Sequence, residues 1–312
     1  MVHVAILAGA KRKNYIRGEA KCFKDMPTGE CIVEEILHAL KGIKKVEDIV
    51  IVGPEEGLGK LKIRDLSHFK KKIFLVKQGK SIQENLILAK EELTIRKKRV
   101  SGLLYILGDT PFRKRISIEE FISQIDQTND VVISYTPEKI IRKYLLLFPK
   151  PLIPLCLQGV PGNFKETNMF YFNPDKIEGD LAKRFYRLRH TSRFRSMLEL
   201  RRIIYSLGGK EVMKVLTRAF VVRQWHKMFR GFMPRWFHTP VPLYRRLEKD
   251  KIMRLAYQKF HLKMDIVFSS YPDGFIDVDN SRDYRKIYRH FFEINKEVTK
   301  DVRVLRKLKS PL

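Results

Sequence analysis

The sequence has few cysteines and no long apolar runs. Its 312 residues include three cysteines, Cys22, Cys31 and Cys156, which have an odd count and no metal-ligand spacing. We therefore expect reduced thiols, as in a cytoplasmic protein, and neither a disulfide framework nor a zinc site. No apolar run approaches the roughly 20 residues that a membrane span needs. The first residues show no charged region or cleavage site, so no signal peptide is predicted.

Several familiar catalytic patterns are also missing. The eight histidines are scattered, and no Ser-His-Asp or Cys-His arrangement is visible. Residues 54–61 come near a Walker A motif, but they lack its leading glycine and its hydroxyl residue. A GxGxxG dinucleotide fingerprint is absent as well. The sequence therefore does not predict triad hydrolysis, a P-loop or a dinucleotide site.

Acidic residues are in deficit. The chain has 35 aspartates and glutamates against 63 lysines and arginines, a formal net charge of +28. Such a surface attracts polyanions, whether nucleic acid, anionic lipid headgroups or phosphorylated substrates. Residues 181–260 alone carry 21 lysines and arginines against 4 acids, so they hold more than half of the excess. A function assigned to this chain has to account for that segment.

The first 135 residues alternate between apolar runs and helical patterns. With 44% hydrophobic and 31% charged residues, the composition is globular. Strands are predicted at 2–8, 48–53, 72–76, 103–107 and 131–134, and helices at 34–43, 81–96 and 117–125. Ser81 with Glu84, and Ser117 with Glu120, match capping boxes. Apolar strands separated by helices indicate an α/β fold with a mainly parallel sheet covered on both faces.

After residue 174 the pattern changes. Residues 175–262 read as a basic, aromatic-rich helical insertion, broken at Gly208-Gly209 and between 231 and 242. A strand at 265–268 and a final helix capped at Ser281 then resume the α/β pattern. We therefore predict an α/β part at 1–174, the insertion at 175–262, and the return of the α/β domain at 263–312.

The turn after the first strand is the first candidate site. Ligands of parallel sheets bind at the carboxyl ends of the strands. Here the chain reads Leu7-Ala8-Gly9-Ala10-Lys11. Small residues let backbone amides approach a triphosphate closely, and basic residues balance its charge. The alternative is an ordinary exit from a strand into a loop.

Two acidic turns are the other candidates. Asp109, in Gly108-Asp109-Thr110-Pro111-Phe112, follows an apolar strand and is placed to hold a divalent cation against phosphate oxygens. The alternative is a helix-entry turn. Asp277 and Asp279 alternate along an extended segment, so both carboxylates could face one cation. The alternative there is an N-terminal cap for the final helix.

Taken together, these motifs resemble the MobA-like NTP transferase family, the GT-A-type nucleotidyltransferases. The opening Leu-Ala-Gly-Gly of that family is similar to residues 7–10, with Ala10 in place of the second glycine. Its Gly-Asp-x-Pro-Phe turn matches 108–112, and its late acidic stretch matches 277–284. Residues 79–85 resemble its base-contacting region. Residues 168–174 resemble a strand in the branch with a helical insertion.

The resemblance implies a three-layer Rossmann-like GT-A fold and a set of site residues. Nucleotide contacts would come from Leu7, Ala8, Gly9, Ala10 and Lys11, with Gly79, Ser81 and Asn85 near the base. Asp109 would bind Mg²⁺ or Mn²⁺, with Asp279 or Asp277 as the second ligand. Lys21 would steady the phosphates, and Asn168 would contact the acceptor.

The implied reaction transfers a nucleoside monophosphate from an NTP to a phosphorylated acceptor and releases pyrophosphate. The acceptor phosphate is the nucleophile, so catalysis needs positioning and charge neutralisation instead of a general base. The acceptor would be a phosphorylated small molecule or a lipid-linked phosphate. Two alternatives remain: a glycosyltransferase that uses NDP-sugars, and a non-catalytic protein that binds a membrane surface or nucleic acid and is built on a transferase scaffold.

Residues 215–245 leave three interpretations open. They interleave tryptophan and phenylalanine with arginine and lysine, which is typical of a helix lying on an anionic membrane surface. The same composition could bind single-stranded nucleic acid, whose bases stack on aromatic rings. A helical lid packed on the α/β core would look similar. The expected location is cytoplasmic. If residues 215–245 bind a membrane, we expect the protein to associate peripherally with the inner membrane face.

Overall fold

The computed structural model describes residues 1–10, 15–96, 100, 102–150, 152–157, 160–173 and 249–309. The chain divides into two compact units. The first contains residues 1–136, 166–174 and 267–312, and the second contains 137–165 and 175–266. Most of the predicted insertion lies outside the described residues, which resume at Lys249. No helix within the described ranges has the length and hydropathy of a membrane span.

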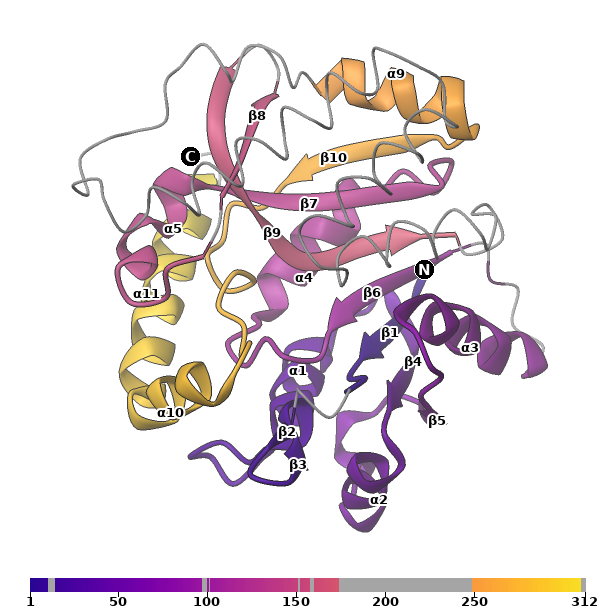
Figure 1. Ribbon diagram of the computed structural model, residues 1–312, viewed down its shortest axis with the longest axis vertical. Helices are drawn as coiled ribbons and strands as arrows, with labels where there is room; N and C mark the ends of the chain where they lie inside the picture. Colours follow the sequence, from indigo (N-terminus) through magenta and orange to yellow (C-terminus); the bar gives the residue numbers. More distant parts are fainter. Residues whose placement is uncertain are drawn as a thin grey trace, which may run out of the picture. The chain divides into compact units, whose positions relative to one another are not determined.

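Four neighbouring strands of the sheet run parallel to one another, from β6 to the edge strand β5 (Figure 1). They are β1 (Val2–Leu7), β4 (Val46–Gly53), β5 (Ile73–Lys77) and β6 (Leu103–Leu107). Leu7 at the end of β1 pairs with Val52 and with Leu107. The carboxyl ends of three strands therefore lie level with one another at one edge. The predicted α/β fold with a mainly parallel sheet is confirmed.

Three further strands extend the sheet beyond β6. They are β7 (Val131–Pro137), β9 (Val160–Phe172) and β10 (Met264–Phe268), and the strand order is β10-β7-β9-β6-β1-β4-β5. β9 runs antiparallel to β6, with Leu103 opposite Phe172. In the second unit, β8 (Ile153–Leu157) pairs antiparallel with the first residues of β9. The antiparallel strand brings residues 166–172 back beside the parallel strands.

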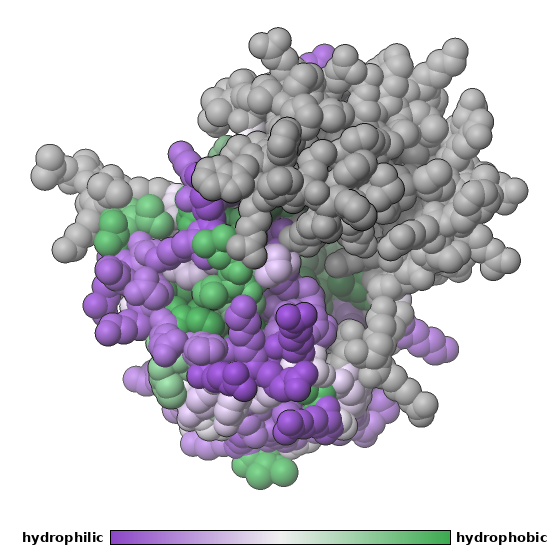
Figure 2. Space-filling model, turned by 60° about the vertical axis from the view of Figure 1, so that its left-hand side comes forward, coloured by the Kyte–Doolittle hydropathy of each residue, from purple (hydrophilic) through white to green (hydrophobic). Residues whose placement is uncertain are grey.

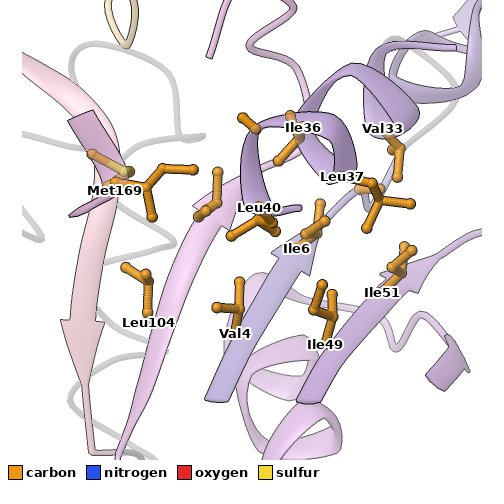
Figure 3. Packing of buried hydrophobic residues seen from close by; sticks show 14 of the residues in the cluster. Val4, Ile6, Val33, Ile36, Leu37, Leu40, Ile49, Ile51, Leu104 and Met169 are labelled. Carbon is orange, nitrogen blue, oxygen red and sulfur yellow. The ribbon is translucent and has the colours of Figure 1, made fainter. Parts of the chain in front are cut away.

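The core forms because the central strands are apolar on both faces. All six residues of β1 are buried. Helix α1 (Ile32–Leu40) packs Ile36, Leu37 and Leu40 against the strand residues Val4 and Ile6 (Figure 3). Burying each such side chain contributes about 1.5–3 kcal/mol. This core holds the carboxyl-end edge of the sheet in place.

Seven further α-helices lie in the described residues. They are α2 (Glu55–Ile63), α3 (Ile82–Ile95), α4 (Arg115–Gln124), α5 (Glu138–Leu145), α9 (Lys249–Phe260), α10 (Ser281–Arg289) and α11 (Phe291–Lys309). Helix α1 begins two residues earlier than predicted, because Glu34 accepts a hydrogen bond from the Cys31 backbone N–H at 2.7 Å. At α3 the predicted cap is confirmed, since Ser81 Oγ accepts from Glu84 N at 3.1 Å.

The predicted capping box at Ser117 and Glu120 is wrong. Helix α4 begins at Arg115, so Ser117 lies inside its first turn. Asp273 accepts hydrogen bonds from Lys114 N at 2.8 Å and from Ser117 Oγ at 2.5 Å. Glu120 accepts from Ser270 N at 3.0 Å instead of closing a box. A carboxylate from a distant segment therefore supplies the cap that the local pattern assigned to the serine.

Candidate active site

The turns after β1 and β6 touch each other at the carboxyl-end edge. Gly108 N donates to Leu7 O at 2.9 Å. A Cβ on Gly108 would lie 3.0 Å from both Cα and Cβ of Ala8, so the close approach requires glycine. The structure therefore brings together the small-residue turn at 7–10 and the acidic turn at 108–109, as the sequence predicts.

The turn after β1 is also bonded to the segment after β5. Gln78 Oε1 accepts from Ala10 N at 2.7 Å, and Gln78 Nε2 donates to Ala10 O at 2.8 Å. Gly79 N donates to Asn85 Oδ1 at 2.7 Å. A Cβ on Gly9 would lie 2.7 Å from Asn85 Nδ2. Residues predicted to contact the nucleotide, Gly9, Ala10, Gly79 and Asn85, thus lie together.

Gln78 was missed by the sequence analysis. Its only signal is its place directly after a predicted strand, at the edge where ligands bind. Ser81, predicted near the base, caps α3 beside this group. Lys11 lies outside the described residues. The contact of all these residues with a nucleotide stays a prediction.

Lys21 joins the two acidic turns. It lies in a short 3-10 helix, η2 (Lys21–Phe23), and is buried. Its Nζ donates to Asp109 Oδ2 at 2.5 Å and to Val278 O at 2.7 Å. Val278 N in turn donates to Asp109 O at 2.9 Å. Segments 88 and 257 positions from Lys21 therefore meet at its ammonium group.

The environment keeps Lys21 charged. Burial disfavours the ammonium, but the carboxylates of Asp109 and Asp279 outweigh that cost and raise the pKa of Lys21. The adjacent Cys22 is different, because burial and then Asp109 raise the pKa of its thiol to about 12. At neutral pH the site therefore presents a permanent cation beside an unreactive thiol.

Only one of the two carboxylate oxygens of Asp109 bonds Lys21. Its Oδ1 is buried and has no hydrogen-bond partner among the described residues, while Oδ2 bonds Lys21. Leaving a buried carboxylate oxygen without a partner is costly, so the group fits a cation at this position. Asp277 is buried and Asp279 is exposed, so the two differ in their access to solvent. Their sharing of one cation stays a prediction.

A cation at this site would need ligands besides the side chains of the described residues. Within the described ranges, no three or more histidines, cysteines, aspartates or glutamates gather as a metal site. Mg²⁺ is commonly held by one or two carboxylates together with substrate phosphates and waters. The carboxylates of Asp109 and of Asp279 or Asp277 fit that kind of site.

A buried ion pair positions the acidic turns. Arg113 and Asp273 have fully buried side chains 3.8 Å apart. Arg113 Nη2 also donates to Thr167 O at 2.6 Å, which links β9 to the pair. Burial lowers the pKa of Arg113, and Asp273 opposes that shift. Because buried charges need partners, this pair holds the segment before Asp277 against the segment after Asp109.

Asn168 also helps to hold the segment before Asp277 in place. Its Nδ2 donates to Gly274 O at 3.0 Å, and its side chain is buried. Its φ of +59° is in the left-handed region, which asparagine tolerates better than most residues. In the structure Asn168 therefore ties β9 to the acidic turn. Its predicted contact with an acceptor stays a prediction.

The start of α10 is capped one residue earlier than predicted. Asn280 Oδ1 accepts from Arg282 N at 2.8 Å and from Asp283 N at 3.0 Å, so Asn280 and not Ser281 is the cap. Asp283 Oδ2 accepts from Asp279 N at 3.3 Å. The capping interpretation of this acidic stretch is confirmed for Asn280. The side chains of Asp277 and Asp279 remain the candidates for a cation site.

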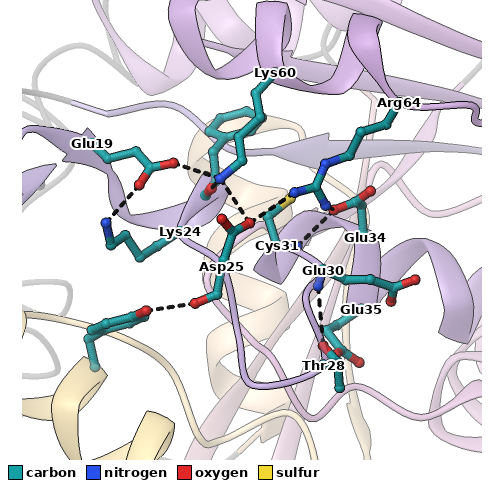
Figure 4. A network of polar contacts seen from close by, with 12 residues as sticks. Glu19, Lys24, Asp25, Thr28, Glu30, Cys31, Glu34, Glu35, Lys60 and Arg64 are labelled. Carbon is teal, nitrogen blue, oxygen red and sulfur yellow. Dashed lines mark hydrogen bonds and ion pairs between the residues drawn. The ribbon is translucent and has the colours of Figure 1, made fainter.

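A polar network fixes the segment that carries Lys21 (Figure 4). Lys60 Nζ contacts Glu19 Oε1 at 2.7 Å, Asp25 Oδ1 at 2.8 Å and Phe23 O at 2.9 Å. We call Lys60, Glu19 and Asp25 the Lys60 clamp. Burial opposes the charge on Lys60, but the two carboxylates raise its pKa. The clamp holds the chain on both sides of Lys21, and the sequence analysis missed it.

The comparisons with known proteins agree with this fold. No protein-family model and no characterised protein sequence matches the chain. A hypothetical transferase structure from Thermus thermophilus superposes with a TM-score of 0.61 at 17% identity, over 90% of this chain and 98% of that one. At this identity the likeness establishes a shared fold.

Two nucleotide-handling enzymes show a weaker likeness. One is a CMP:2-keto-3-deoxy-manno-octonic acid synthetase complexed with CTP, with a TM-score of 0.48, 10% identity, and coverage of 94% of this chain and 99% of that one. The other is 4-diphosphocytidyl-2C-methyl-D-erythritol synthase from Anaerococcus prevotii, with a TM-score of 0.47, 13% identity, and coverage of 93% and 96%.

Proposed function

We propose that this chain is a nucleotidyltransferase that moves a nucleoside monophosphate from an NTP to a phosphorylated acceptor. The observation that carries the proposal is the meeting of Lys21, Asp109 and segment 277–279 beside the small-residue turn at 7–10. A triphosphate needs a fixed cation, close backbone amides and carboxylates for a metal ion. This edge of the sheet has the cation and the carboxylates, and the small residues of the turn at 7–10 let a triphosphate approach the backbone beside them.

Lys21 is the proposed phosphate-binding cation. An ammonium group has three hydrogen-bond donors. The contacts with Asp109 and Val278 O use two, so the third is left for a phosphate oxygen. Because its pKa is raised, Lys21 stays protonated across the neutral range and can offset charge that builds up on the leaving pyrophosphate.

Asp109 Oδ1, with Asp279 or Asp277, would hold Mg²⁺ or Mn²⁺. Such an ion, when bound, supplies charge neutralisation at the phosphate oxygens. The Lys21 contact holds the Asp109 carboxylate in one orientation, and the buried Arg113–Asp273 pair holds the segment before Asp277. The chain therefore orients its carboxylates before a substrate arrives.

The reaction needs no general base from the chain. A phosphate oxygen of the acceptor attacks the α-phosphorus of the NTP, and the bond from that phosphorus to the bridging oxygen breaks. The bridging oxygen leaves on pyrophosphate with the electron pair. The turn at 7–10 is held by Gln78, and Gly79 beside it is held by Asn85, so the two segments would fix the nucleotide and positioning would contribute to the rate.

The acceptor class follows from the charge of the chain. An excess of 28 positive charges favours a phosphorylated acceptor, either a small molecule or a lipid-linked phosphate. Residues 215–245, proposed to meet an anionic membrane surface, lie outside the described residues. Nucleic acid is the less favoured partner for that segment.

The test is a screen for pyrophosphate release. Four NTPs are offered with Mg²⁺ against phosphorylated sugars, polyols and lipid headgroups. Asp109→Asn keeps the size of the side chain but removes its charge, so kcat should fall about a hundredfold or more. The control is Asp250→Asn, an exposed position in α9. Melting temperatures should show that both variants are folded.

Two results would overturn the proposal. One is a screen in which the intact chain releases no pyrophosphate from any NTP. The other is release by Asp109→Asn at the rate of the intact chain. A non-catalytic binding protein would produce the first result, and a site elsewhere on the fold would produce the second.

A further inference from the structure

A second concave surface lies in the first unit, away from the nucleotide turn. It is a groove of about 440 Å³ between the first turn of α4 and the C-terminal half of α11. We call it the basic groove and define it by Lys114, Arg115, Glu119, Thr299, Arg303 and Arg306. It shares no lining residue with the turn at 7–10 or with the Lys21–Asp109 pair.

The charge of the basic groove is one-sided. Four of the eight residues that line it are lysine or arginine, Ile116 and Val302 are apolar, and Glu119 is the one acid among them. Arg115 Nε donates to Glu119 Oε1 at 2.7 Å, which neutralises that acid. Arg303 and Arg306 are exposed and one helical turn apart, so they lie on the same side of α11. The groove therefore presents more positive than negative side chains to an anion that approaches it.

The positive end of α4 does not account for the groove. Asp273 already accepts from Lys114 N and from Ser117 Oγ, so the start of the helix has its anionic partner. Lys114 Nζ donates to Asn295 Oδ1 at 2.5 Å, which fixes this cation at the wall. The attraction for an anion therefore comes from side chains on two elements.

The guanidinium groups indicate which anion fits. Arginine presents parallel N–H donors that match the oxygens of phosphate, and two arginines one turn apart can hold two such groups. Thr299 adds a hydroxyl to the same wall. A volume of about 440 Å³ leaves room for a compact phosphorylated group.

We propose that the basic groove binds a phosphate-bearing ligand separately from the nucleotide site. The phosphate comes either from a free small molecule or from a phospholipid headgroup. On α11, Phe292 is 64% exposed and Val304 is 50% exposed, so apolar side chains flank the cations as at a membrane surface. This helix lies on the left of Figure 1, the side that Figure 2 turns forward.

The ligand would lie next to the active-site supports. Lys114 and Arg115 follow the buried Arg113, and Lys114 N is bonded to Asp273, four residues before Asp277. A phosphate bound at the first turn of α4 would therefore contact the helix whose N-terminus is bonded to Asp273. Through Asp273 this helix is connected to the acidic turn. This placement goes beyond the proposed transferase activity and does not depend on it.

The experiment compares two matched arginine pairs in the full chain. Arg303→Gln with Arg306→Gln removes two groove cations. Arg282→Gln with Arg285→Gln removes two exposed cations with the same spacing in α10. Calorimetry measures binding of sodium pyrophosphate without Mg²⁺, and co-sedimentation measures binding to vesicles of phosphatidylcholine with one-fifth phosphatidylglycerol. Asp109→Asn with Lys21→Met serves as the background for all chains, so that the nucleotide site contributes little.

The groove variant should bind at least one probe about tenfold more weakly than the α10 variant, because charged hydrogen bonds are lost. If only pyrophosphate binding is weakened, the ligand is a free phosphorylated molecule. If only vesicle binding is weakened, the ligand is a phospholipid headgroup. Arg303→Lys with Arg306→Lys should restore part of the binding if the fold is intact. Equal affinity of the groove and α10 variants for both probes overturns the proposal.

Discussion

Gly9 shows how closely the proposed nucleotide site is packed. A Cβ at this position would lie 2.7 Å from Asn85 Nδ2 and 3.2 Å from Gln78 Oε1. Those two side chains hold Gly79 N and the backbone of Ala10. One added methyl group would therefore push apart the two segments that are proposed to hold the nucleotide.

Gly9→Ala should raise KM for the NTP by about tenfold, because each displaced hydrogen bond costs about 0.5–1.5 kcal/mol. The control is Gly59→Ala in α2, where a Cβ meets nothing within 4 Å. Gly59→Ala should leave KM unchanged and stabilise the fold by about 0.5–1 kcal/mol. Steady-state kinetics and thermal melts measure both effects. An unchanged KM in Gly9→Ala would show that this turn does not bind the nucleotide.

At the scale of elements, α2 fixes the position of Lys21, the lysine proposed to bind phosphate. Lys60 on α2 contacts Glu19, Phe23 O and Asp25, which precede and follow Lys21. These side chains are partly exposed, so each ion pair contributes less than about 1 kcal/mol to stability. The main role of the Lys60 clamp is therefore to fix the position of Lys21.

Lys60→Met should lower kcat about tenfold while KM for the NTP changes little, because a displaced Lys21 stabilises the transition state less well. Lys60→Arg should restore most of the rate, because it keeps the charge. Lys62→Met, an exposed position on the same helix, is the control. If the clamp is merely structural, Lys60→Met will lower the melting temperature and leave kcat of the folded enzyme unchanged.

The whole molecule carries a positive charge far beyond what its proposed chemistry requires. Its net charge is +28, and residues 181–260 hold more than half of it. Hydrophilic side chains also cover much of the described face in Figure 2, with hydrophobic patches between them. The expected consequence is binding to anionic surfaces that weakens as salt rises.

Deleting residues 215–245 should abolish most binding to vesicles that contain anionic lipid. The intact chain should bind them at low salt and release them at high salt, because surface charges are screened within about 8 Å at physiological ionic strength. Co-sedimentation with neutral phosphatidylcholine vesicles is the control. Failure of the intact chain to bind anionic vesicles at low salt would end the membrane interpretation of this segment.

Much of the element order could be predicted, because it depends on neighbouring residues. Apolar runs at 2–8, 48–53 and 103–107 are strands, and Ser81 caps its helix as its spacing indicates. Other elements escaped prediction. Helix α2 begins after Pro54, in a segment whose sequence was compared only with a phosphate-binding loop. Strand β9 runs antiparallel to β6, and the sequence motif covered only the last residues of that strand.

The sequence by itself determined the apolar strands, the small-residue turn at 7–10 and the acidic residue two positions after β6. Only the tertiary structure decided the partners of Lys21, since Asp109 and Val278 lie 88 and 257 positions away. The same holds for Asp273, which caps α4 from 159 positions away. Local patterns describe backbone preference and burial. Long-range hydrogen bonds and ion pairs depend on which strand ends the folded sheet brings to one edge.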